Sequence, residues 1–82
     1  MVIDVLGLPG EATFALIAAL DEALAELDLG DGVVVRRIED PCLMIARNVR
    51  RPPALMVNGK VVCRRRIPSV TEIRGYLEAA EA

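Results

Sequence analysis

The feature that most constrains the fold is a helical pattern of apolar residues between two short strand-like runs near the start of the chain. Residues 2–6 are apolar apart from Asp4, and residues 33–35 are three consecutive valines, a composition that favours strands. From Glu11 onward, apolar residues recur every three or four positions, which is the spacing of one helix face. These residues are Phe14, Ile17, Leu20, Leu24 and Leu27. We expect the glycine-containing segment 29–32 to stop the helix. Two strands joined by a helix run parallel with a right-handed crossover, so the sequence predicts an α/β fold.

The middle of the chain predicts a short helix and a hairpin. Asp40 before Pro41 is typical of a helix N-cap followed by proline at the first helical position, and the helix is expected from Cys42 to Arg47. Asn58-Gly59 lies between two strand-like segments, 54–57 and 60–64, and is the strongest short hairpin signal.

The end of the chain predicts one more helix. Ser69-Val70-Thr71-Glu72 is a capping box, in which Ser and Glu side chains reciprocally bond backbone N–H groups. The residues expected on the inner face of this helix are Val70, Ile73, Leu77 and Ala80. The predicted order is β-α-β-α-β-β-α in a single domain of residues 1–82, with a mixed four-stranded sheet and helices on both faces.

The composition excludes several kinds of protein. The chain has no His, which removes the commonest general base and metal ligand. Cys42 and Cys63 are too far apart in sequence for a CxxC motif or a zinc knuckle, so we expect neither a metal nor a cofactor. No apolar run is long enough for a membrane span, and the first residues do not look like a signal peptide. A cytoplasmic location with reduced thiols is therefore expected.

Charge is distributed unevenly along the chain. The first 31 residues carry acids and no base, whereas all ten basic residues lie between 32 and 74. This asymmetry favours a charged partner or self-association, and the alternative is that it serves only solubility. Nucleic acid is not expected as a partner, because the net charge is −2 and almost no aromatic side chains are available for stacking.

Three stretches show a resemblance to a known family: residues 3–7, residues 53–62, and residues 66–70 with Glu72 and Ile73. On these the chain resembles the small thioredoxin-like proteins of archaea and bacteria. The resemblance covers nearly the whole chain and implies the sheet order 2-1-3-4. It also implies that Pro53 is the cis-proline that faces the active site, which suits a proline opening a strand.

The resemblance also implies where a CxxC motif belongs, and the motif is absent there. Counted from Gly7, its two cysteines fall on Gly10 and Thr13, within Gly10-Glu11-Ala12-Thr13. A Thr hydroxyl is not ionised near neutral pH and cannot replace a thiolate, so we expect disulfide exchange at this position to be lost. Pro52 occupies the position whose N–H family members offer to a bound peptide or glutathione, so that hydrogen bond is lost too.

The two cysteines elsewhere leave a second hypothesis. We expect them at opposite edges of the sheet, roughly 14 Å apart, which is too far for a disulfide. Cys63 is interpreted as a small residue of an edge strand and Cys42 as part of helix packing. The alternative is a single reactive thiol, with Cys63 beside its arginines as the first candidate and Cys42 at a helix start as the second.

A basic cluster is a candidate for binding. It contains Arg50, Arg51, Arg64, Arg65 and Arg66. We expect these arginines to converge near the Gly10 turn, where they would attract an anion unless they form only a solvated charged surface.

The short helix is the other candidate. Its residues Cys42, Leu43, Met44 and Ile45 are apolar on every side, which predicts an exposed patch for a protein partner or a homodimer, or else a locally deeper core. The main hypothesis is thus a redox-inactive binding or assembly module. The alternative is an oxidoreductase that works through one cysteine.

Overall fold

The computed structural model describes residues 1–29 and 32–81. Its elements follow in the order β1 (Val2–Leu6), α1 (Glu11–Leu27), β2 (Val34–Ile38), α2 (Pro41–Ala46), β3 (Ala54–Val57), β4 (Lys60–Arg64) and α3 (Val70–Glu81). This order confirms the predicted β-α-β-α-β-β-α fold. Of the segment expected to stop the first helix, Gly30 and Asp31 lie outside the described residues.

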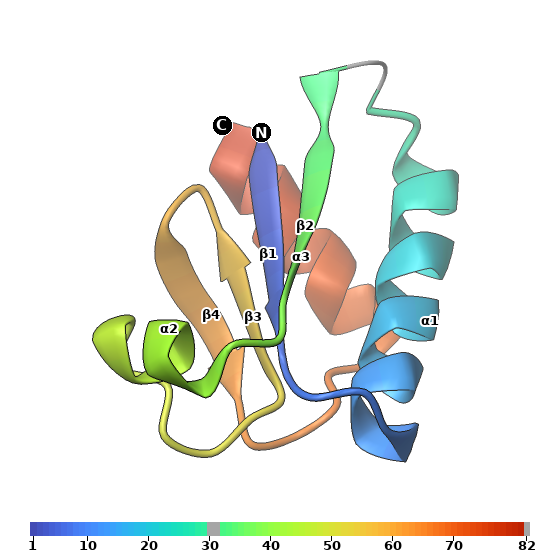
Figure 1. The fold of residues 1–82 in the computed structure, drawn as a ribbon. Helices are drawn as coiled ribbons and strands as arrows, with labels where there is room; N and C mark the ends of the chain where they lie inside the picture. The colour runs from blue at the N-terminus through green and yellow to red at the C-terminus, as the bar shows by residue number, and fades with distance from the viewer. Residues whose placement is uncertain (30–31, 82) are drawn as a thin grey trace.

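The sheet has the strand order β2-β1-β3-β4, as predicted. Strands β1 and β2 pair in parallel, whereas β3 pairs antiparallel with both β1 and β4 (Figure 1). The hairpin between β3 and β4 turns at Asn58 and Gly59, which both have positive φ, as the Asn-Gly signal predicts.

Two packed clusters lie on the two faces of the sheet. Because successive side chains of a strand point to opposite faces, each central strand contributes to both clusters. Ile3, Val5, Leu55 and Val57 face the helices α1 and α3. Leu6, Ala54 and Met56 face the other side, where Met44 of α2 packs on them. Figure 1 shows α2 on one side of the sheet and the two long helices on the other.

The inner face of α1 differs from the prediction. Its buried residues are Thr13, Leu16, Leu20 and Ala23, whereas Phe14 is 54% exposed. Ile17, Leu24 and Leu27 contact the core only from its margin. The face is rotated because the helix packs closely against Gly7, and this tertiary contact buries the polar Thr13 in place of the apolar Phe14.

The predicted helix starts are confirmed. The Asp40 carboxylate accepts a hydrogen bond of 2.9 Å from the Cys42 N–H, and Pro41 is the first residue of α2. At α3 the Glu72 N–H donates to the Ser69 hydroxyl and the Ser69 N–H donates to the Glu72 carboxylate. These are the reciprocal bonds of a capping box, so local hydrogen bonding fixes where both helices begin.

Candidate functional site

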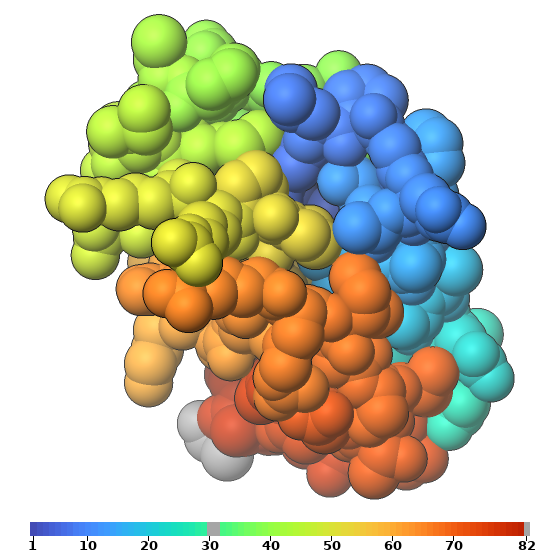
Figure 2. All heavy atoms as spheres, turned by 90° about the horizontal axis from the view of Figure 1, so that it is seen from below, coloured from blue at the N-terminus to red at the C-terminus, as the bar shows by residue number. Residues whose placement is uncertain are grey.

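Three loops meet at one end of the sheet. They follow β1, precede β3 and follow β4, and since β3 runs antiparallel to its neighbours all three lie at the same end. Figure 2 looks onto this end, where residues near 8–13 in blue, 48–53 in yellow and 64–67 in orange lie side by side. The candidate site is therefore assembled from segments far apart in sequence.

The positions expected for the two thiols lie in this end. Gly10 is the N-cap of α1, and its carbonyl accepts a hydrogen bond of 2.9 Å from the Phe14 N–H. Thr13, one turn further, is only 4% exposed. Both line a shallow hollow of about 260 Å³ with Pro52 and Pro53, whose peptide bond is cis. The structure thus brings Gly10 and Thr13 together with Pro53, and no sulfur lies among the residues of this hollow.

A close contact holds Thr13 in place. A Cβ added to Gly7 would lie 2.5 Å from the Thr13 Oγ1 and 3.4 Å from its Cγ2. Real Cβ atoms do not approach other atoms this closely, so residue 7 must lack a side chain if Thr13 is to be buried here. The Thr13 side chain therefore fills the position where the family resemblance implies a second thiol.

The two cysteines lie on opposite faces of the sheet, and both are free. Cys42 is exposed on α2, whereas Cys63 is buried in the cluster under α1 and α3. The Cys63 Sγ donates a hydrogen bond of 3.7 Å to the Arg66 carbonyl. As expected, Cys63 lies on the edge strand β4 and Cys42 follows the opposite edge strand β2, and α2 in addition places Cys42 on the other face of the sheet. The solvent-accessible thiol is Cys42, the second of the two candidates.

Four of the five expected arginines line one groove. Arg50, Arg51, Arg64 and Arg65, together with Asn48, surround a hollow of about 400 Å³. The Arg65 N–H donates a hydrogen bond of 3.1 Å to the Pro53 carbonyl, which ties the groove to the neighbouring hollow. The arginine segments lie at the same end of the sheet as the Gly10 turn, as expected, but Gly10 itself lines the neighbouring hollow and not this groove.

Arg66 is the fifth arginine, and it points elsewhere. Its guanidinium forms two hydrogen bonds to the Glu72 carboxylate, of 3.1 and 2.6 Å. These bonds and the Ser69 N–H lower the pKa of Glu72 from 4.5 to about 2, and the same ion pair raises the pKa of Arg66. Arg66 therefore secures the start of α3 and is not a groove residue.

The short helix α2 has one covered side and one open side. Met44 is buried against the sheet, whereas Leu43 is 47% exposed and Ile45 is 67% exposed. Cys42 lies on the exposed surface as well. The predicted apolar helix is thus only partly covered within the described residues 1–29 and 32–81.

Sequence reasoning missed an ion pair of the sheet in which a buried carboxylate meets a largely exposed arginine. Asp4 of the central strand β1 is 2% exposed and lies directly opposite Arg36 of β2. The Arg36 Nε and Nη2 donate to the two carboxylate oxygens of Asp4 at 2.7 and 3.0 Å, which raises the pKa of Arg36. An Asp within an apolar strand was the available signal, because a buried carboxylate requires a partner.

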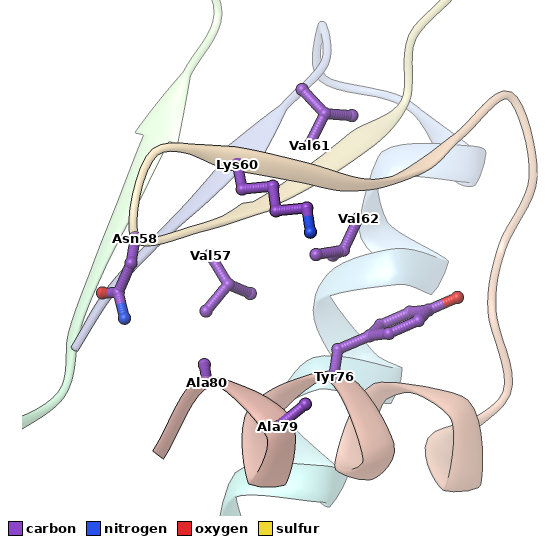
Figure 3. A pocket seen from close by; sticks show the side chains of 8 residues that line it. All are labelled: Val57, Asn58, Lys60, Val61, Val62, Tyr76, Ala79 and Ala80. Atoms are coloured by element: carbon purple, nitrogen blue, oxygen red, sulfur yellow. The ribbon is translucent and has the colours of Figure 1, made fainter. Parts of the chain in front are cut away.

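A larger hollow than either of the two described above lies at the other end of β3 and β4, away from every predicted site residue. It has a volume of about 530 Å³ between the hairpin and α3. Figure 3 shows its apolar surface of Val57, Val62 and Ala79, with Lys60 and Tyr76 as its long polar-tipped side chains.

Neither a metal site nor a membrane span is found in the part of the chain that the structure describes. No three His, Cys, Asp or Glu side chains there are grouped so that they could hold a metal ion. No helix of that part combines the length and the apolar character needed to cross a membrane.

A mixed sheet of order β2-β1-β3-β4, with a cis-proline opening β3 opposite the start of the first helix, defines a protein of the thioredoxin-like fold class. A family model described as "Thioredoxin domain" matches residues 1–78, and the chain belongs to this family. Among curated proteins, none matches the chain.

Proposed function

We propose that this thioredoxin-family domain is a redox-inactive binding module that uses the end of the sheet where the three loops meet. The observation that carries the proposal is the pair Gly10 and Thr13, which lies beside Pro53 without a sulfur. Disulfide exchange requires a thiolate as the attacking group, and a glycine and a buried threonine supply none. The fold then remains as a rigid support for the loops.

Two surfaces support a binding role. The arginine groove, made of Arg50, Arg51, Arg64 and Arg65, favours an anionic partner. The exposed Leu43 and Ile45 of α2 favour a protein partner, and a second copy of the chain would satisfy the same apolar surface. The proposal requires neither a metal nor a cofactor, and it places the domain in the cytoplasm, where both free thiols stay reduced.

One observation favours a second candidate function. Cys42 is an exposed thiol at the first turn of α2, so a domain that works through one cysteine would use Cys42. Cys63 is a weaker candidate because its sulfur is buried beneath α1 and α3. The second candidate is thus an oxidoreductase-related protein that would use the exposed one of its two thiols, on α2.

An insulin-reduction assay with dithiothreitol as electron donor separates the two functions. We expect the native chain, Cys42→Ser and Cys63→Ala to give the rate measured without protein. Alanine is chosen at the buried Cys63 because a serine hydroxyl there would lose its hydrogen bonds to water. A rate enhancement that disappears in Cys42→Ser, and persists in Cys63→Ala, would establish the single-cysteine function instead.

Sedimentation velocity over a range of concentrations tests the α2 surface. We expect native protein to associate and Ile45→Glu to remain monomeric, because a carboxylate in an apolar contact is strongly disfavoured. Ala25→Glu adds the same charge at an exposed position of α1 and should behave as the native chain does. A native chain that stays monomeric at millimolar concentration rules out self-association through α2.

A further inference from the structure

We propose that the arginine groove binds an anion that carries two or more linked phosphate groups. This inference deepens the proposed binding function and depends on it for the role of this end of the sheet. The groove has a volume of about 400 Å³, which is within the range of small-molecule sites. Its ligand would be a small molecule with a diphosphate or longer phosphate chain.

Most arginines outside the groove are paired with acids. Of these five arginines, Arg36, Arg37, Arg66 and Arg74 each form an ion pair with a carboxylate, and Arg47 alone has none among the described residues. None of the four groove arginines has a carboxylate partner within residues 1–29 and 32–81, and no acid lines the groove. The chain contains more acids than bases, so acids were available to neutralise the groove. Four unpaired guanidiniums around one hollow repel one another, and a bound polyanion would reverse that repulsion.

Arg65 supplies a second, independent observation. Its backbone φ is 67°, in the left-handed region that only glycine adopts without steric penalty. The position is fixed, because the Arg65 N–H bonds the Pro53 carbonyl. Glycine adopts this backbone conformation without the steric penalty, so an arginine at position 65 lowers the stability of the fold. Strain of this kind is concentrated at functional sites.

The number of charges favours linked phosphates over a single one. A phosphate monoester carries about −1.5 to −2 charges at neutral pH, which is half of what four arginines can balance. Guanidinium donates two parallel hydrogen bonds to phosphate oxygens, so neighbouring phosphates can engage all four side chains. Two other anions differ from linked phosphates. A citrate-like polycarboxylate has a similar total charge, but each of its groups is planar and has two oxygens. A nucleic-acid strand has only one charge on each phosphate.

Isothermal titration of the native chain with pyrophosphate at low salt tests the proposal. We expect pyrophosphate and tripolyphosphate to bind at least tenfold more tightly than orthophosphate, citrate or a single-stranded oligonucleotide. Arg65→Gly should weaken pyrophosphate binding by about tenfold, the effect of losing a charge-assisted hydrogen bond. The same variant should keep or raise the Tm, because it removes the left-handed strain at residue 65.

Two control variants separate charge from position. Arg65→Lys keeps the charge but loses the planar fork, so its affinity should lie between those of the native chain and Arg65→Gly. Lys60→Ala removes one positive charge at the opposite end of β4 and should leave the affinity unchanged. Equal affinity in Arg65→Gly and the native chain, or tighter binding of citrate or the oligonucleotide, would overturn the phosphate assignment.

The titration and the insulin assay can fail separately. If the chain shows neither pyrophosphate binding nor disulfide-exchange activity, the assignment of a linked-phosphate ligand is overturned and the proposal of redox inactivity is retained. Cysteine-dependent turnover in a chain that still binds pyrophosphate at Arg65 overturns redox inactivity, whereas the assignment of a phosphate ligand to the arginine groove is retained.

Discussion

Replacing Gly7 by alanine should destabilise the domain through one specific contact. The new methyl group would lie 2.5 Å from the Thr13 Oγ1, where ordinary contacts begin near 3.4 Å. Thr13 is buried and its branched side chain has little freedom to move aside. Overpacking of this kind lowers the free energy of unfolding by about 1–3 kcal/mol.

A second substitution should relieve the contact. In a Thr13→Ala background the Oγ1 and Cγ2 are absent, and the nearest remaining atom of residue 13, the Cβ, lies 3.5 Å from the added methyl. The double variant that combines Gly7→Ala with Thr13→Ala should therefore be more stable than the two single losses predict, by about 1–2 kcal/mol of coupling energy. Part of the space left by the threonine is refilled by the new methyl group.

Urea unfolding of the native chain, the two single variants and the double variant, followed by circular dichroism, measures this coupling, because small single domains usually unfold in two states. Gly75→Ala is the matched control: its added Cβ meets no atom within 4 Å, and α3 should gain about 0.5–1 kcal/mol from it. Strict additivity of Gly7→Ala and Thr13→Ala, or a Gly7→Ala protein as stable as the native chain, would refute the assignment of Thr13 to this position.

Three other predictions concern stability. The pKa of Glu72 is about 2 in the folded chain against an ordinary 4.5, so its ionised form stabilises the fold above pH 4.5 and this stabilisation is lost as the pH falls toward 2. The stability difference between the native chain and Glu72→Gln should accordingly shrink over that range in acid titrations of urea unfolding, and a constant difference would contradict the ion pair with Arg66. Leu20→Ala removes a fully buried side chain of α1 and should lower the free energy of unfolding by about 2–5 kcal/mol, whereas a loss below about 1 kcal/mol would argue against its place in the core. Asp40→Ala removes the cap of α2 and should lower the free energy of unfolding by about 1 kcal/mol, a loss that Asp40→Ser should largely avoid if the cap hydrogen bond is its cause.

The parts of the fold that the sequence predicts well depend on local hydrogen bonds. The cap at Asp40, the capping box at Ser69 and Glu72, and the turn at Asn58 each involve residues only a few positions apart. Such signals depend only on residues that are close together in the sequence, so the sequence predicts the element order and the helix starts.

The parts that the sequence predicts poorly depend on contacts between distant segments. The α1 face is rotated because Gly7 allows Thr13 to be buried, and apolar spacing alone favours Phe14. The partner of Asp4 is set by the register of β1 against β2, which no local pattern encodes. The same holds for Cys42, whose position depends on where α2 packs on the sheet.

The sequence predicts the candidate site only in part, as it does the fold. The thiol positions follow from a count along the chain, and four of the five arginines do share a groove. Arg66 does not line the groove because its guanidinium bonds the carboxylate of Glu72, which also takes part in the capping box. The strained backbone of Arg65 is visible only in three dimensions.

The missing thiols are tested most directly by putting them back. Gly10 has an extended backbone, and the nearest atom to an added Cβ is the Leu8 carbonyl oxygen at 3.9 Å, so cysteine fits there; cysteine and threonine are of similar size at residue 13. The insulin-reduction rate of the double variant Gly10→Cys with Thr13→Cys should rise clearly above the uncatalysed rate, while the native chain stays at that rate. Turnover by the native chain, or a two-cysteine variant as inert as the native chain, would contradict the claim that the loss of sulfur at these two positions is what makes the domain redox-inactive.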